Sequence, residues 1–196
     1  NILLIYFTVG IGLGIVLKGG VYNGESGFAG ELGHTRWGYS PTNQANGGIE
    51  LKQIVSVPSL LSEYHQKEFD DAELSQNWLP LMEEISKQYT NGEKRAVDLL
   101  RNTGRFLGQV VGSLADIFDP GVIAIGGRVE PILPIWLPMI REQARAFSFL
   151  TRNRDLLITN APELDSMILT GCGEAAFQQW ITTSDITSYA TTRSSR

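Results

Sequence analysis

The sequence predicts an α/β domain built on a mixed sheet, with antiparallel strands near its start, a parallel pair further along and helices packed against them. Two apolar runs, at residues 2–7 and 15–17, flank a glycine-rich connection and predict the antiparallel strands. Residues 122–181 alternate strand, helix, strand and helix patterns, an order that favours parallel pairing with right-handed crossovers. Between these regions, apolar residues recur at intervals of three and four residues over residues 91–117. This spacing predicts a long helix lying on the sheet.

The glycine-rich stretch at residues 8–34 is where we expect a ligand site. Its first part, TVGIGLG, predicts a tight connection whose backbone N–H groups, at Thr8, Gly10, Gly12 and Gly14, can hold phosphate oxygens. A β-hairpin softened by glycine, without a ligand, is an equal alternative because short GxGxG runs are common. The later segment GFAGELGH places Glu31 and His34 three residues apart beside Gly30, with little bulk to keep a small polar ligand away. The alternative is that both side chains only cap the loop.

The remaining elements follow from periodicity and turn residues. Residues 39–48 predict an exposed loop, residues 49–55 and 58–66 predict short helices, and residues 71–88 predict one or two surface helices broken at Pro80. The helix at 91–117 carries core residues as far as Ile117, and we interpret Asp116 and Asp119 as capping residues. Residues 122–125 and 156–159 predict buried strands, residues 131–149 and 164–181 predict helices, and residues 182–196 predict a loose polar tail.

Composition excludes several classes of function. The chain has 196 residues, 42% of them hydrophobic, which suits one α/β domain with an adequate core. Its formal net charge is −5 and it has no run of lysine or arginine, so by itself it is a poor binder of nucleic acid. The single cysteine, Cys172, excludes an intramolecular disulfide and fits a reducing compartment. Without a signal peptide or a run of about 20 apolar residues, we expect a cytoplasmic protein with no membrane partner.

Three segments resemble the ROK family of bacterial repressors, open reading frames and sugar kinases. They are the glycines at 10, 12, 14 and 24 with GELGH at 30–34, the strand and turn FDPGVIAIGG at 118–127, and the segment LTGCGEAA at 169–176. The resemblance implies that residues 1–181 form the C-terminal lobe of an actin-like ATPase, or ribonuclease H-like, fold. In that family an N-terminal lobe comes first, and in repressors a winged helix-turn-helix precedes it. We therefore expect this chain to be a fragment that lacks both.

The resemblance also implies the site residues. Glu31 and His34 face the sugar in the family, Gly30 belongs to the same segment, and Glu50 matches a second sugar-facing glutamate. Carboxylates suit vicinal hydroxyls because each can accept two hydrogen bonds. Thr8, Gly10, Gly12, Gly14, Gly126 and Gly127 are the phosphate or nucleotide candidates, if that function is retained.

The sequence departs from the family in the loop that follows the histidine. Family members carry three cysteines there, which bind zinc together with that histidine. Residues 42–48 contain no cysteine. We therefore expect no bound metal, because a structural zinc site needs four nitrogen or sulfur ligands. The loss also weakens the assignment of Glu50, since the metal organises that loop in the family.

Two functions remain open. The first is effector binding and oligomerisation in a NagC-like repressor, with a sugar or sugar phosphate as effector, a homodimer or homotetramer as assembly, and DNA contacted only through the absent N-terminal domain. The second is the C-terminal lobe of an ATP- and Mg²⁺-dependent sugar kinase. The family's catalytic aspartate precedes this chain, so we expect no phosphorylation by the chain alone and only weak sugar binding. Apolar residues of the 131–149 helix beyond one core face (Trp136, Leu137, Met139 and Ile140) predict self-association. An upstream helix-turn-helix would favour the regulator, and an upstream DxGGT-like loop the kinase.

Overall fold

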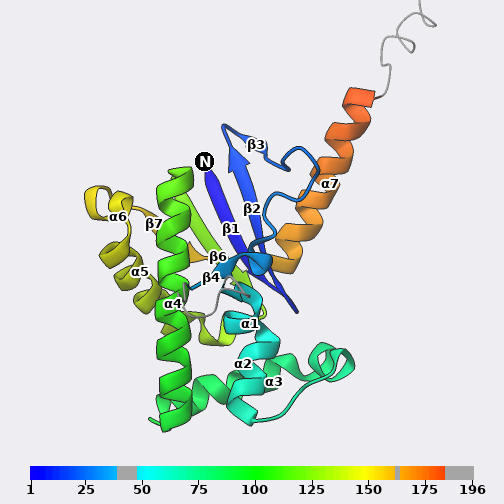
Figure 1. Cartoon of the computed structure of the whole chain (residues 1–196). Coiled ribbons are helices and arrows are strands. Elements are labelled where there is room, and N and C mark those ends of the chain that lie inside the picture. Colours follow the sequence, from blue (N-terminus) through cyan, green and yellow to red (C-terminus); the bar gives the residue numbers. More distant parts are fainter. Residues whose placement is uncertain (39–47, 162–163, 184–196) are drawn as a thin grey trace, which may run out of the picture. The chain divides into compact units, whose positions relative to one another are not determined.

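A computed structural model describes residues 1–38, 48–161 and 164–183. The chain divides into two compact units, residues 1–161 and residues 162–196. The described residues of the first unit form a mixed sheet, a small two-stranded sheet and six α-helices (Figure 1).

The main sheet has five strands in the order β3-β2-β1-β6-β7. Strands β1 (Ile2–Phe7), β2 (Ile11–Leu17) and β3 (Gly20–Val21) pair antiparallel. Strand β6 (Val122–Gly127) pairs parallel with β1 on one side and with β7 (Leu157–Asn160) on the other. This arrangement confirms the predicted mixed sheet. The predicted parallel pair is present, and β1 extends it to three parallel strands.

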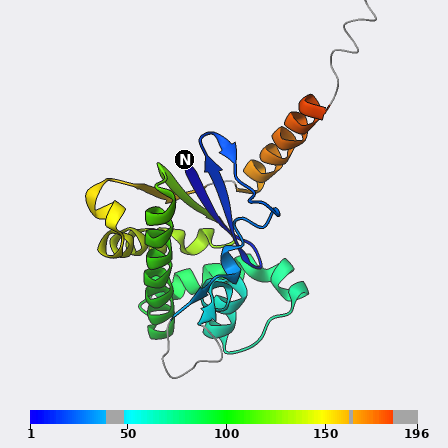
Figure 2. The ribbon, with the colours of Figure 1, turned by 45° about the horizontal axis from the view of Figure 1, so that its top comes forward.

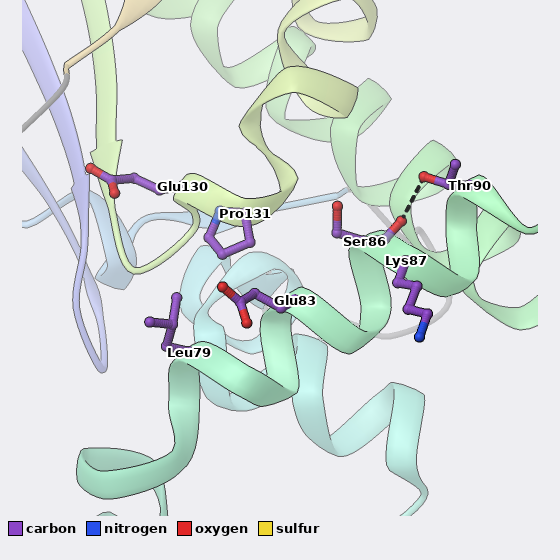
Figure 3. A pocket seen from close by; sticks show the side chains of 7 residues that line it. All are labelled: Leu79, Glu83, Ser86, Lys87, Thr90, Glu130 and Pro131. Carbon is purple, nitrogen blue, oxygen red and sulfur yellow. Dashed lines mark hydrogen bonds between the residues drawn. The ribbon is translucent and has the colours of Figure 1, made fainter.

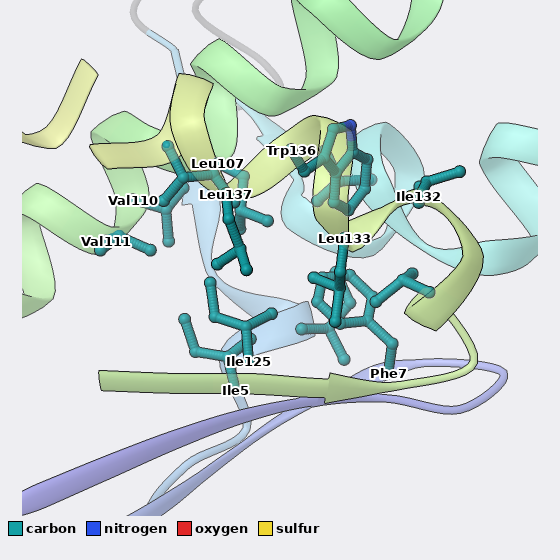
Figure 4. Packing of buried hydrophobic residues seen from close by; sticks show 14 of the residues in the cluster. Ile5, Phe7, Leu107, Val110, Val111, Ile125, Ile132, Leu133, Trp136 and Leu137 are labelled. Carbon is teal, nitrogen blue, oxygen red and sulfur yellow. The ribbon is translucent and has the colours of Figure 1, made fainter. Parts of the chain in front are cut away.

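Alternation along β1 shows which face of the sheet meets the core. Leu3, Ile5 and Phe7 are fully buried, whereas the residues between them are only half-buried. Ile5, Phe7 and Ile125 of the sheet pack against apolar side chains of two long helices, as Figure 4 shows. The rings of Phe7 and Trp136 lie 6.0 Å apart at their centroids, so an aromatic contact joins the sheet to the helix layer.

The helices on this face are α4 (Lys94–Phe118) and α5 (Leu133–Phe147), which lie against each other (Figures 1 and 2). Glycine makes their close approach possible. A Cβ atom on Gly108 would lie 2.6 Å from Cβ of Gln143, and one on Gly104 would lie 2.9 Å from the Trp136 ring. The long helix predicted at residues 91–117 is confirmed as α4. Ile117 was expected in the core but is 72% exposed.

The remaining described elements complete the first unit. They are η1 (Leu32–His34), β4 (Arg36–Trp37), β5 (Ile49–Glu50), α1 (Leu51–Val55), α2 (Val57–His65), α3 (Asp71–Thr90), η2 (Glu130–Ile132) and α6 (Phe149–Asn153). Strands β4 and β5 pair antiparallel and form the two-stranded sheet.

Several sequence predictions are wrong in extent. The glycine-rich connection was placed at residues 8–14, but the turn covers only residues 8–10, and Gly12 and Gly14 lie inside β2. Residues 49–50 form a strand before the first short helix begins. Pro80 does not break α3, because buried residues on both sides of it, Leu74, Met82 and Ile85, hold both halves against the core. For the same reason α3 is not purely a surface helix.

The predicted helix at 131–149 divides into η2, α5 and the start of α6. Its apolar residues were expected to exceed the needs of one core face. Instead Trp136 and Ile140 are fully buried, and Leu137 is 9% exposed. These three side chains belong to the core of the unit, whereas Met139 is half-buried, and self-association stays a prediction.

The described part of the second unit is one helix, α7 (Leu164–Thr183). It confirms the helix predicted at residues 164–181. Met167, Leu169, Cys172 and Phe177 are exposed on it. Residues 182–183, predicted as the start of a tail, belong to this helix. The rest of that tail and residues 39–47 of the predicted exposed loop lie outside the described residues. Among the described helices, none is long and apolar enough to span a bilayer.

Candidate functional site

The GELGH segment is held against β2 by backbone contacts. The N–H of Leu13 donates to the carbonyl of Gly30 over 2.8 Å. Gly30 has a φ of +97°, and a Cβ atom there would lie 2.0 Å from the carbonyl oxygen of Leu13. At Gly33 an added Cβ would lie 2.9 Å from the carbonyl oxygen of Ile11. Both glycines are therefore required by this close packing on the strand.

The side chains of the segment divide into two groups. Leu32 is 4% exposed and belongs to the core. Glu31 and His34 are exposed on either side of it, at the start and end of η1. The fold thus fixes the backbone of the segment through Gly30, Leu32 and Gly33, and it presents a carboxylate and an imidazole to solvent.

A charged cluster surrounds Glu50 next to this segment. Lys52 Nζ lies 3.2 Å from Glu50 Oε2, Arg36 Nη1 lies 3.6 Å from Glu50 Oε1, and His34 Nδ1 lies 3.8 Å from Glu50 Oε2. The structure therefore brings His34 and Glu50 together, as the prediction of one shared site requires. Arg36 and Lys52 were not predicted. Only the pairing of β4 with β5, which sets Arg36 opposite Glu50, places Arg36 here.

Glu50 has a structural task as well as a charge. It is the N-cap residue of α1, its side chain accepts from the backbone N–H of Gln53, and Gln53 Oε1 accepts from the N–H of Glu50 over 3.2 Å. The hydrogen bond from Lys52 holds the pKa of the Glu50 carboxyl below its usual range; partial desolvation opposes this, and the charges of Lys52, His34 and Arg36 reinforce it. Glu50 is therefore ionised at neutral pH.

The tautomer of His34 follows from its neighbour. His34 Nδ1 lies 3.3 Å from Lys52 Nζ, and an ammonium group can only donate. In the neutral imidazole, Nδ1 therefore accepts from Lys52, and the ring hydrogen is assigned to Nε2. His34 then offers one N–H donor to a ligand.

Most of the predicted phosphate residues gather at one end of the sheet. Phe7, the last residue of β1, lies opposite Ile11 of β2 and Gly127 of β6, so the turn at residues 8–10 and the glycines at 126–127 are neighbours. This is the carboxyl end of the parallel strands, where ligands of open α/β sheets bind. Because Gly33 packs on Ile11, the GELGH segment lies at the same end.

Local contacts already use part of the proposed phosphate cradle. The N–H of Thr8 donates to the carbonyl of Gly10 over 3.0 Å, and the N–H of Gly10 donates to Thr8 Oγ1 over 3.4 Å. Inside β2, the position of a Cβ on Gly12 is filled by the ring of Tyr6, 2.1 Å away. The assignment of these residues to phosphate stays a prediction.

An open hollow of about 480 Å³ lies between α3 and the Glu130–Pro131 turn (Figure 3), and none of the predicted site residues lines it. Within residues 1–38, 48–161 and 164–183, no group of three or more His, Cys, Asp or Glu side chains could hold a metal ion. The prediction that the chain binds no zinc stays a prediction.

Comparison with known proteins decides the family. The model of the ROK family matches residues 1–173. The chain belongs to the ROK family.

Curated relatives of this family member include both repressors and kinases. The chain is 28% identical over 179 residues to the xylose repressor of Caldicellulosiruptor bescii, covering 86% of this chain and 44% of the repressor. It is 27% identical over 145 residues to the DNA-binding transcriptional dual regulator NagC of Escherichia coli (67% of this chain, 33% of NagC). A glucokinase of Halalkalibacterium halodurans is 25% identical over 157 residues (76% and 47%). The chain thus spans less than half the length of these relatives.

Solved structures confirm the fold. A ROK family transcriptional regulator, described as a homologue of the Escherichia coli MLC protein, superposes with a TM-score of 0.64 at 27% identity and covers 82% of this chain and 41% of that chain. The ROK glucokinase of Streptomyces griseus, solved with glucose and AMPPNP, gives a TM-score of 0.60 at 26% identity (81% and 54%). The chain therefore has the actin-like ATPase fold of these proteins, as the sequence predicted.

Proposed function

We propose that this chain is the effector-binding and oligomerisation part of a NagC-like ROK transcriptional regulator, with a sugar or sugar phosphate as the effector. The observation that carries the proposal is the presentation of Glu31 and His34 on a segment whose backbone is clamped to β2. A fixed backbone lowers the entropy lost when these side chains order around a ligand. A carboxylate that accepts from hydroxyls and an imidazole N–H that donates suit a polyol.

The relatives support the regulator. Proteins named as xylose repressors and as NagC are among the curated relatives, and a ROK transcriptional regulator is among the similar structures. The chain is acidic, with a formal net charge of −5. In this proposal DNA is contacted by a part of the protein outside residues 1–196, and the effector acts by changing the geometry of a homodimer or homotetramer.

A second candidate is the C-terminal lobe of a ROK sugar kinase. Two observations favour it: the likeness to glucokinases, one of them solved with glucose and AMPPNP, and the meeting of the 8–10 turn with Gly126 and Gly127 at the carboxyl end of the parallel strands. A kinase would use ATP and Mg²⁺. Its catalytic base is expected outside this chain, because Asp116 is engaged with α6 rather than with this end of the sheet.

Calorimetry of the full-length protein that contains this chain, with a panel of sugars, tests the sugar site. We expect one member of a panel of xylose, glucose, N-acetylglucosamine and their phosphates to bind, and we expect Glu31→Ala and His34→Ala each to weaken it by about tenfold or more, the cost of one charge-assisted hydrogen bond. Glu25→Ala is the matched control, because Glu25 is an exposed carboxylate of the same loop region. Unchanged affinity in both site variants would remove the sugar site.

A phosphoryl-transfer assay separates the two candidates. The protein is incubated with ATP, Mg²⁺ and the sugar that binds, and ADP is measured. The regulator predicts binding without turnover, and the kinase predicts sugar-dependent ADP release.

A further inference from the structure

The carboxylate of Glu50 is already engaged by groups of its own chain. It accepts from the N–H of Gln53 as part of the α1 cap, and Lys52 Nζ and Arg36 Nη1 lie 3.2 and 3.6 Å from its two oxygens. Its side chain is 25% exposed. Glu50 thus holds Lys52 and Arg36 beside each other, and its contacts with Lys52 and Gln53 use part of its acceptor capacity.

The groups beside Glu50 that face a ligand are donors. The contacts that the described residues make with Lys52, to Glu50 and to His34 Nδ1, use two of the three N–H groups of the ammonium. His34 contributes its Nε2–H, and Arg36 is a guanidinium that pairs with Glu50. The side chains of Lys52, Arg36 and His34 are 39%, 48% and 59% exposed, so solvent and a ligand reach all three.

The local charge is opposite to that of the whole chain. Two permanent cations stand beside one carboxylate here, in a protein whose formal net charge is −5. Arginine and lysine placed together in this way are typical of sites that bind phosphate or carboxylate.

We infer that the effector of this site is an anionic sugar, with its phosphate or carboxylate bound by Lys52 and Arg36 beside His34. The inference rests on the proposed function and deepens it, because it chooses a charged sugar over a neutral one. Glu31 is the group left for the hydroxyls of the same ligand, and its negative charge keeps the anion at the other end of the segment, near Lys52.

Matched pairs of sugars test the inference on the same protein. Titration calorimetry compares glucose with glucose 6-phosphate, N-acetylglucosamine with its 6-phosphate, and glucose with glucuronate, and inorganic phosphate serves as the anion alone. We expect the charged member of one pair to bind at least about tenfold more tightly than its neutral partner, and we expect this advantage to shrink as salt rises from about 0.05 to 0.5 M. The phosphate and glucuronate arms show which anion is preferred.

Variants assign the effect to the named residues. Lys52→Met and Arg36→Gln should each reduce affinity for the charged sugar by about tenfold. Arg36→Gln leaves the contact between Lys52 and His34 in place, so it should change affinity for the neutral sugar by less than about twofold. Lys94→Met is the matched control, since Lys94 also pairs with a carboxylate, at 2.7 Å from Asp98, but on α4. Circular dichroism confirms that each variant is folded.

The possible outcomes distinguish a failure of the anionic effector from a failure of the proposed function. A neutral sugar that binds as tightly as its charged partner, and that needs Glu31 and His34, overturns the anionic effector and leaves the proposed function standing. Absence of binding by every sugar, charged or neutral, overturns the proposed function and the inference together. Preference for the charged sugar that survives in both Lys52→Met and Arg36→Gln shows that its anion binds elsewhere, and that also overturns the inference.

Discussion

Replacing Gly30 with alanine should both destabilise the protein and disrupt the candidate site. A φ of +97° costs an alanine about 1–2 kcal/mol. The new Cβ would lie 2.0 Å from the carbonyl oxygen of Leu13 and must move to at least 3.4 Å, an ordinary contact distance. That movement breaks the 2.8 Å hydrogen bond from the N–H of Leu13 to Gly30, worth about 0.5–1.5 kcal/mol. The expected total is about 1.5–3.5 kcal/mol.

Gly27→Ala provides the matched control. Gly27 also has a positive φ, +79°, but a Cβ added there meets no atom within 4 Å. It should therefore cost only the backbone strain, about 1 kcal/mol. Urea-induced unfolding followed by tryptophan fluorescence measures both variants, and calorimetry measures the sugar affinity, which should fall only in Gly30→Ala. Equal destabilisation by the two variants would show that packing on β2 does not fix the segment.

Two further predictions concern the sheet and the helix layer. Gly12→Ala should destabilise the protein because its Cβ would lie 2.1 Å from the Tyr6 ring. Adding Tyr6→Ala should recover part of the lost stability, because the clash is then removed. Additive losses in a double-mutant cycle would contradict this. Asp116 accepts from Ser148 Oγ and from the N–H groups of Phe149 and Leu150, and although burial alone raises its pKa, these hydrogen bonds bring the pKa below its ordinary value of 3.8. Because the folded pKa lies below the unfolded one, the stabilisation is present above the unfolded pKa and is lost as pH falls through the folded one. Asp116→Asn should therefore cost about 1–2 kcal/mol at pH 7 and much less at pH 3 in urea unfolding, and a loss that does not change with pH would refute the reasoning.

The sequence predicted the parts of the fold that depend on local pattern. The apolar runs at residues 2–7 and 122–125 and the regular spacing of α4 are strong signals, and all three elements formed where expected. The continuity of α3 through Pro80 was not predictable in this way. It depends on Leu74, Met82 and Ile85 finding partners in elements distant along the chain.

The candidate site shows the same limit more sharply. Glu31, His34 and Glu50 were named from motif resemblance, but the cluster around Glu50 depends on the register of β4 with β5 and on the position of α1. A register cannot be obtained from the composition of a two-residue strand. Arg36 lies two residues after His34, and Lys52 lies two residues after Glu50. This closeness in the sequence is the one signal that could have drawn attention to them.

The GELGH segment can be divided residue by residue according to what the fold requires. Gly30 and Gly33 are needed because the backbone passes too close to Leu13 and Ile11 for any side chain, and Leu32 is needed because it fills the core. Neither packing nor backbone geometry requires a carboxylate at position 31 or an imidazole at position 34, since both side chains are exposed. Glu31 and His34 are therefore exposed residues that stability does not require, on a backbone that stability does fix. Such positions are suited to recognising a ligand. The same reasoning separates Glu50, which caps α1, from Lys52 and Arg36, which no cap or core requires, and it is why those two cations, rather than Glu50, carry the inference about the effector.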